Sequence, residues 1–431
     1  MALALGARVH QAVESCAGDL WDLSQFLWAN PETSMKEATA HTKLCDFLER
    51  NGFKVTRRYV LDTAFKAEFT SPGGFDGPTI TFICEYDALP EIGHACGHNL
   101  VAECAVGAAI AVKETMKEFK NIRGKVVVLG TPGQENFGGK EILLQKGAFK
   151  EMDVALRAHP ATLDSVKLPL AASQQITVQF QCSPRYKCPW EAASALDAAV
   201  ASYVNIALLR QQVKPPSKIT GEYPINSCVQ LESGRNVIVM PETSRVVYHV
   251  RAPTVADLAE LMRRVEACLE AAAESTDCSL VQEKSILYKD FVHNNALNAI
   301  YAKHAGDMGV TFSDPDNSLV VPLGAFSDAG NASQALPVLN ATFSIPSAGV
   351  NHTRSFASAA GSLEAQTCAR RATKLLALTA LDLYTDPKLL ASVKQEFQDW
   401  KAKQPPKQDQ RRQLVQEELQ RQQVQLDQQQ Q

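Results

Sequence analysis

The first 160 residues alternate between two hydrophobic patterns. Apolar residues recur at helical spacing over 8–29 and 36–51, which predicts two amphipathic helices. Short apolar runs bounded by turn residues follow, as is typical of strands that alternate with helices. The expected strands are Lys54–Val60, Lys66–Thr70, Ile80–Cys84, Lys125–Gly130 and Asp153–Arg157, with helices over 100–119 and 139–147. This alternation predicts an α/β fold whose mixed or parallel sheet carries helices on both faces.

A different pattern begins near residue 172. The expected elements are strands over Ile176–Gln181, 226–232 and 244–251, a helix over 189–212, and a helix from Thr254 to Ser275. Asp257 follows Thr254 by three residues, the spacing of a capping box. These elements predict an α+β unit over 172–286 that is inserted into the first domain.

The first pattern resumes after the insertion, so residues 1–171 and 287–395 are predicted to form one discontinuous domain. Met308–Thr311 and Ala341–Ile345 are expected strands, and Leu363–Tyr384 is an expected apolar helix. Residues 396–431 are rich in glutamine and poor in core-forming residues, so a disordered tail or a solvated helix is predicted there.

Composition narrows the class of protein. Hydrophobic residues make up 45% of the chain and charged residues 21%, as in globular proteins, and the net charge of −4 offers no basic surface for nucleic acid or anionic membrane. No apolar run is long enough to span a bilayer, and the N-terminal run is too short for a secretory signal. The 11 cysteines lack the spacing of a disulfide framework, which favours a reducing, cytoplasmic location.

Several residues with metal-binding side chains lie where a strand or loop gives way to the next element. They are Cys96, His98, Glu135, His159 and His352. Thiolate, imidazole and carboxylate groups suit zinc-like metals, and ligands in open α/β folds collect beyond the carboxyl ends of strands. Each residue alone has an ordinary structural explanation, such as a buried thiol or a loop carboxylate. Together the five predict a metal site.

Longer motifs link this site to a known family. The run Cys84-Glu-Tyr-Asp-Ala-Leu-Pro90, followed by IGHACGHN at 92–99, resembles the M20 metallopeptidases, in the branch of amidohydrolases and dipeptidases that has a cysteine ligand. Further matching pieces are VVVLGTP at 126–132, GGK at 138–140, AHP at 158–160, PWEAASALDAAV at 189–200, RAPT at 251–254 and NHT at 351–353. The resemblance covers most of the chain but not its glutamine-rich tail.

The resemblance implies a zinc-peptidase-like catalytic domain interrupted by a lid domain that usually dimerises, and hence a homodimer. It implies two divalent ions, zinc or manganese, held by the five residues named above. Asp87 would orient one of the metal ligands. A small dipeptide-like ligand would be held by Asn236, Arg251, Ser327 and Asp328.

The chain departs from the family where protons are handled. The family has two consecutive glutamates after the buried strand, a general base and then a metal ligand, whereas this chain has Gln134-Glu135. Glutamine has no titratable proton and cannot act as the base. The family's lid histidine is also missing, and Arg185 or Lys187 offers a positive charge in that segment instead. Asn340 stands where the relatives usually have a histidine.

Three hypotheses follow. The first is an M20 dipeptidase-like protein that keeps its metal site but has impaired or lost peptidase activity. The second is an active metal-dependent dipeptidase or amidohydrolase that cleaves small basic dipeptides, such as Xaa-Arg or β-alanyl-lysine, with an altered base. The third is a non-catalytic dimeric scaffold that acts through its tail.

Overall fold

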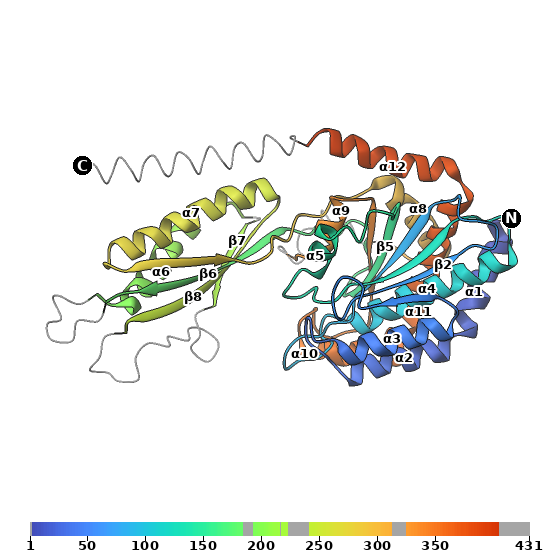
Figure 1. The fold of residues 1–431 in the computed structure, drawn as a ribbon, viewed down its shortest axis with the longest axis horizontal. Helices are drawn as coiled ribbons and strands as arrows, with labels where there is room; N and C mark the ends of the chain where they lie inside the picture. Colours follow the sequence, from blue (N-terminus) through green and yellow to red (C-terminus); the bar gives the residue numbers. More distant parts are fainter. Residues whose placement is uncertain (1, 184–192, 216, 223–240, 313–324, 405–431) are drawn as a thin grey trace.

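The computed structural model describes residues 2–183, 193–215, 217–222, 241–312 and 325–404, which form two units, each with its own sheet (Figure 1). The expected strand 226–232, the start of the helix expected at 189, and Asn236, Arg185 and Lys187 lie outside the described residues. Among the described helices, none is both long and apolar enough to cross a membrane.

The larger unit is built on a mixed six-stranded sheet. Its strands are β1 (Lys54–Arg57), β2 (Phe65–Thr70), β3 (Thr79–Cys84), β4 (Lys125–Gly130), β5 (Val154–Ala161) and β10 (Val338–Ser344), in the order β1-β2-β4-β3-β5-β10. The four strands from β4 to β10 run parallel, while β1 and β2 pair antiparallel at one side. The α/β fold with a mixed sheet is confirmed.

Both faces of this sheet are covered because its central strands are apolar on both sides. On β4, Val126 and Val128 pack into one core, and Val127 and Leu129 into a second core on the opposite face. The helices are α1 (Ala2–Ser15), α2 (Ala17–Ala29), α3 (Ala38–Arg50), α4 (His98–Glu118), α5 (Gly139–Gln145), α8 (Asn295–Asp307), α9 (Ala329–Ser333), α10 (Arg354–Ala360), α11 (Leu363–Thr385) and α12 (Pro387–Ala402). Helices α4 and α11 cover the first face, and α5 and α9 contribute to the second core.

The smaller unit is a four-stranded antiparallel sheet backed by two helices. Its elements are β6 (Ala172–Gln181), α6 (Ala195–Arg210), β7 (Lys218–Glu222), β8 (Thr243–Ala252), α7 (Val255–Glu274) and β9 (Ser279–Lys284), with the strand order β7-β8-β6-β9. Ile176, Val178 and Phe180 alternate along β6 into a core shared with both helices. Thr254 accepts the backbone N–H of Asp257, so the expected cap of α7 is confirmed.

The structure corrects four of the expected elements. The helix expected over 8–29 is divided at Cys16, between α1 and α2. The strand expected at Met308–Thr311 is wrong, since Met308 is the C-cap of α8 and its backbone N–H bonds to carbonyls of that helix. Strand β5 runs on to Ala161, so His159 lies within the strand and not after it.

The expected tail boundary at residue 396 is also wrong. Helix α12 continues to Ala402 and buries Phe397. The carboxylate of Glu396 accepts the backbone N–H groups of Asn295 and Ala296, at 2.8 Å each, in the first turn of α8. These contacts dock the helix on the larger unit, and composition alone gave no sign of them.

A buried carboxyl in α4 gives the fold a pH dependence. Burial raises the pKa of Glu103 from its ordinary 4.5 to about 8. The folded protein therefore holds this group protonated at neutral pH, and its contribution to stability falls as the pH rises from about 4.5 to about 8. We expect Glu103→Gln to stabilise the protein increasingly over the wild type between pH 5 and pH 8, measured by urea unfolding. A difference that is independent of pH would contradict this assignment.

Candidate metal centre

The loop before α4 turns sharply so that Cys96 and His98 face one point. Gly97 is the N-cap of α4 and has a left-handed φ of 79°. A Cβ atom on this glycine would lie 2.5 Å from Cγ of Pro160, so no larger residue fits without displacing the neighbouring strand. The loop therefore brings a thiol and an imidazole against the end of β5, which carries His159.

The remaining candidate ligands come from separate loops. Glu135 follows β4, which is parallel to β3 and ends at the same edge of the sheet as β5. His352 precedes α10 and has a left-handed φ of 68°, and its backbone N–H donates to the carbonyl of Ala95 over 2.8 Å. That hydrogen bond joins the loop of His352 to the loop of Cys96.

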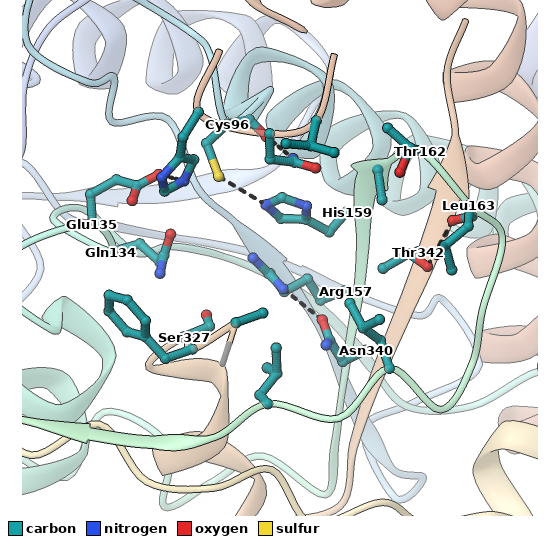
Figure 2. A pocket seen from close by; sticks show the side chains of 18 of the residues that line it. Cys96, Gln134, Glu135, Arg157, His159, Thr162, Leu163, Ser327, Asn340 and Thr342 are labelled. Atoms are coloured by element: carbon teal, nitrogen blue, oxygen red, sulfur yellow. Dashed lines mark hydrogen bonds and ion pairs between the residues drawn. The ribbon is translucent and has the colours of Figure 1, made fainter. Parts of the chain in front are cut away.

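The five side chains form two groups that share one thiol. Cys96, His98 and His159 make one group, with 3.4 Å from Cys96 Sγ to His159 Nε2. Cys96, Glu135 and His352 make the other, with 3.4 Å from His352 Nε2 to Glu135 Oε1. In each group the ligand atoms lie within 4.8 Å of one another. Figure 2 shows Cys96, Glu135 and His159 directed toward the same space.

The chemistry of these atoms fits a pair of divalent ions. Nε2 of His98 and Oε1 of Glu135 are buried and have no hydrogen-bond partner among the described residues. Buried polar atoms are rarely left in this state, and a bound metal would satisfy both. Thiolate, imidazole and carboxylate are the donors that zinc-type ions take.

Asp87 supports the ligands from behind. His98 Nδ1 hydrogen-bonds to the backbone carbonyl of Asp87 at 2.8 Å and lies 2.9 Å from its Oδ1, which leaves Nε2 of that ring facing the other ligands. Oδ2 of Asp87 accepts the hydroxyl of Ser34 and the backbone N–H of Glu135. One buried residue, Asp87, thus positions a candidate ligand of each group through its backbone carbonyl and its carboxylate.

Gln134 lines the cavity beside Glu135, as Figure 2 shows. Its backbone carbonyl oxygen accepts a hydrogen bond from the hydroxyl of Tyr288 at 3.0 Å. The preceding residue, Gly133, donates its N–H to buried Glu37 at 2.9 Å. Burial, followed by the negative charge of Asp87, raises the pKa of Glu37 to about 6. The backbone on which a general base would sit is therefore firmly held.

A buried ionic network lies beneath the cavity. Glu85 forms two salt bridges, from Oε1 to Lys140 Nζ at 2.6 Å and from Oε2 to Arg157 Nη2 at 2.7 Å. Lys140 Nζ forms another with Oδ1 of Asp328 at 2.7 Å. Burial alone would raise the pKa of Glu85, but the two cations hold it well below its usual range. Asp328, which was expected to hold a ligand, is fully buried in this network and is not among the described residues that line the cavity.

The cavity beside the candidate ligands has a volume of about 360 Å³. Ser327 and Arg251 line it, as do Cys96, Gln134, Glu135, His159 and His352. Arg251 comes from β8 of the smaller unit, and its guanidinium lies 4.7 Å from the ring centre of Phe326. Residues of both units thus line this space. Asn236, which was also expected to hold a ligand, lies outside the described residues.

Sequence reasoning overlooked the basic floor of this cavity. Arg157 lines the cavity and donates to Asn340 Oδ1 at 2.6 Å. The sequence does carry a signal for Arg157. It is a charged residue in an otherwise apolar buried strand, two positions before His159. Lys218 was overlooked too, because the short strand β7 was not expected.

Fold and ligand set together define the class as metal-dependent hydrolases in which an α/β domain is interrupted by a smaller α+β domain. The chain belongs to the M20 metallopeptidase family. It is 36% identical over 404 residues to the Xaa-Arg dipeptidase of Mus musculus, across 91% of this chain and 92% of that protein. The Homo sapiens protein of the same name is also 36% identical, over 409 residues. No family model matches the chain.

More distant relatives and solved structures agree with this fold. One subunit of the p-aminobenzoyl-glutamate hydrolase of Escherichia coli is 28% identical over 320 residues, across 68% of this chain and 63% of that one. A putative aminohydrolase from Staphylococcus aureus superposes with a TM-score of 0.69 at 15% identity, across 88% of this chain and all of that one. A dinuclear metal-binding M20 peptidase from Bacillus subtilis gives 0.63 at 18% identity, across 86% and 99%.

Because Cys96 belongs to both ligand groups, its removal should affect both metal positions. We expect Cys96→Ala to lose nearly all bound metal, and His352→Ala to retain about one of two ions per chain, as measured by mass spectrometry of the purified protein. Cys368→Ala, at a half-buried thiol outside the site, is the matched control and should keep its metal. Undiminished metal in Cys96→Ala would refute the shared position.

Proposed function

We propose that this chain is an M20 dipeptidase-like protein that binds two divalent ions, zinc or manganese, and a small dipeptide-like ligand, with impaired or lost hydrolysis. One observation carries the proposal. An amide, Gln134, lies beside the candidate ligand Glu135, where the family has its general base. The free cysteines among the described residues support a reducing, cytoplasmic location.

No other group among the described lining residues is suited to replace the base. Glu135 is the only carboxylate among them, and it belongs to a ligand group. Glu37 and Glu85 lie nearby but are fully buried and engaged, the first with the backbone of Gly133 and the second with Arg157 and Lys140. A general base must reach the proton that it abstracts, and neither buried carboxylate lines the cavity.

The bound metals would supply Lewis-acid polarisation of a scissile carbonyl. Holding a ligand and polarising it does not require Gln134 to titrate. Transferring a proton to the leaving amine does require a titratable group at that place. The site therefore supports binding better than turnover.

The second candidate is an active dipeptidase, favoured by the name shared by the mouse and human relatives. It requires a base other than residue 134. The two candidates differ in wild-type turnover.

Restoring the carboxylate should restore proton transfer. We expect Gln134→Glu to raise dipeptide hydrolysis by up to roughly 10²–10⁴-fold over the wild type, the usual contribution of a positioned general base. The measurement is amino acid release from a panel of dipeptides with acidic, neutral and basic C-terminal residues, using metal-saturated protein.

Gln134→Ala is the control, because it removes the amide without adding a base and should leave turnover at the wild-type level. Robust wild-type hydrolysis that is abolished in Cys96→Ala would overturn the proposal of impaired activity and favour the active dipeptidase.

We further propose that the chain forms a homodimer through the smaller unit. Helix α6 exposes Val200, Val204 and Leu208 at fractions of 52%, 47% and 61%, and their spacing of four residues puts them on one helical face. An apolar stripe of this kind is favoured as a protein–protein contact.

Charging this stripe should separate the subunits. The double variant Val204→Glu/Leu208→Glu should elute as a folded monomer in size-exclusion chromatography with light scattering, whereas the wild type elutes as a dimer. Leu363→Glu, an exposed leucine on α11 of the larger unit, is the matched control and should remain dimeric. A monomeric wild type, or a double variant that stays dimeric, would contradict the assignment.

A further inference from the structure

Two cysteines of the smaller unit lie directly opposite each other on adjacent strands. Strands β6 and β9 pair antiparallel, and the last pair in their register is Gln181 with Ser279. Cys182 follows the first of these residues and Cys278 precedes the second, so the next position of the register brings the two cysteines together. The Cα atoms of directly opposite residues in an antiparallel pair are about 4.5–5.5 Å apart, which lies within the range that a disulfide bond spans.

The two thiols also lie on the same face of the sheet. Side chains alternate along a strand, and the pair of Phe180 with Leu280, two positions further along the register, packs against the core shared with α6 and α7. Cys182 and Cys278 pack against that same core. Burial raises the pKa of the Cys182 thiol, and contact with the Cys278 side chain raises it further. Register and packing therefore place the two sulfur atoms side by side.

The pair lies where four elements of the smaller unit meet. Cys182 Sγ is 3.3 Å from the backbone carbonyl oxygen of Ala193 and 3.5 Å from that of Pro241, just before α6 and β8. Cys278 Sγ is 3.6 Å from the carbonyl oxygen of Ser194, the N-cap of α6. A covalent bond between the two sulfur atoms would therefore join the end of β6 to the beginning of β9 at the place where α6 and β8 also begin.

A small reagent can reach this pair. Cys182 and Cys278 are half-buried, whereas Cys45, Cys84 and Cys104 are fully buried in the larger unit. Exchange of a thiol with a disulfide requires access for the reagent as well as a partner sulfur within reach. Neither thiol is among the described residues that line the cavity at the metal centre, so the inference does not depend on the proposed function.

We propose that Cys182 and Cys278 form a reversible redox pair, which closes to a disulfide by exchange with a low-molecular-weight disulfide and so crosslinks β6 to β9. In the first step one cysteine loses its proton, and its thiolate attacks the small disulfide, breaks the S–S bond and displaces one small thiol. In the second step the thiolate of the other cysteine attacks the protein sulfur of the mixed disulfide, and the second small thiol leaves as the protein S–S bond forms. The two cysteines together lose two electrons and two protons, and the small disulfide takes up both.

Oxidised and reduced glutathione, added to full-length, metal-saturated protein, test the pair. We expect oxidised glutathione to produce a Cys182–Cys278 crosslinked peptide, detected by mass spectrometry after alkylation and non-reducing digestion, and an excess of reduced glutathione to remove it. Absence of this peptide would overturn the proposal, as would a bond from Cys182 to Cys188 or Cys228, which lie outside the described residues. A crosslink that forms only in denaturing urea would overturn it too, because it would not depend on the folded register.

Thermal unfolding supplies an independent test. A crosslink that spans about 100 residues should raise the Tm of the smaller unit by roughly 5–10 °C, because it lowers the entropy of the unfolded chain. This difference between oxidised and reduced protein should vanish in Cys182→Ser and in Cys278→Ser. Cys268→Ser, at a half-buried thiol on α7 of the same unit, is the matched control and should retain it. Equal Tm values for oxidised and reduced wild type, or a difference that persists in both Cys182→Ser and Cys278→Ser, would contradict the crosslink.

Discussion

The centre of this protein depends on one shared thiol. Cys96 belongs to both ligand groups, so the geometry of each group is tied to the other. That position is set by Gly97, whose left-handed turn lies against Pro160, and by the bond from His352 to the carbonyl of Ala95. Asp87 then fixes His98 and the backbone of Glu135 together. Loops that are far apart in the sequence are in this way held to a single arrangement.

The proposed function separates the candidate ligands, which the structure brings together, from the group that would transfer a proton. In the proposed function, Gln134 stands where the family has its general base, and the nearby Asn340 accepts a hydrogen bond from Arg157. Metal binding needs only the donor atoms and their supports, whereas hydrolysis also needs a group that titrates in contact with the substrate. A chain can therefore keep the first property after losing the second.

Much of the fold, and the five side chains that the structure brings together, could be predicted from the sequence because each rests on local signals. Strand β4 follows from an unbroken apolar run, and the cap of α7 from Thr254 and Asp257. The loop of Cys96 and His98 follows from its motif. Docking of α12 could not be predicted, since it depends on Glu396 meeting the first turn of α8. The buried pairing of Asp328 with Lys140 likewise arises only when distant segments meet.

The central claim is the proposal that the metal site persists while hydrolysis is impaired or lost. The most direct test measures metal content and dipeptide hydrolysis on one preparation of the wild-type protein. The account predicts about two bound ions per chain, together with hydrolysis that is absent or far slower than that of Gln134→Glu measured alongside. A folded protein that binds no metal would contradict the first half of the claim, and metal-dependent hydrolysis at a rate typical of peptidases would contradict the second.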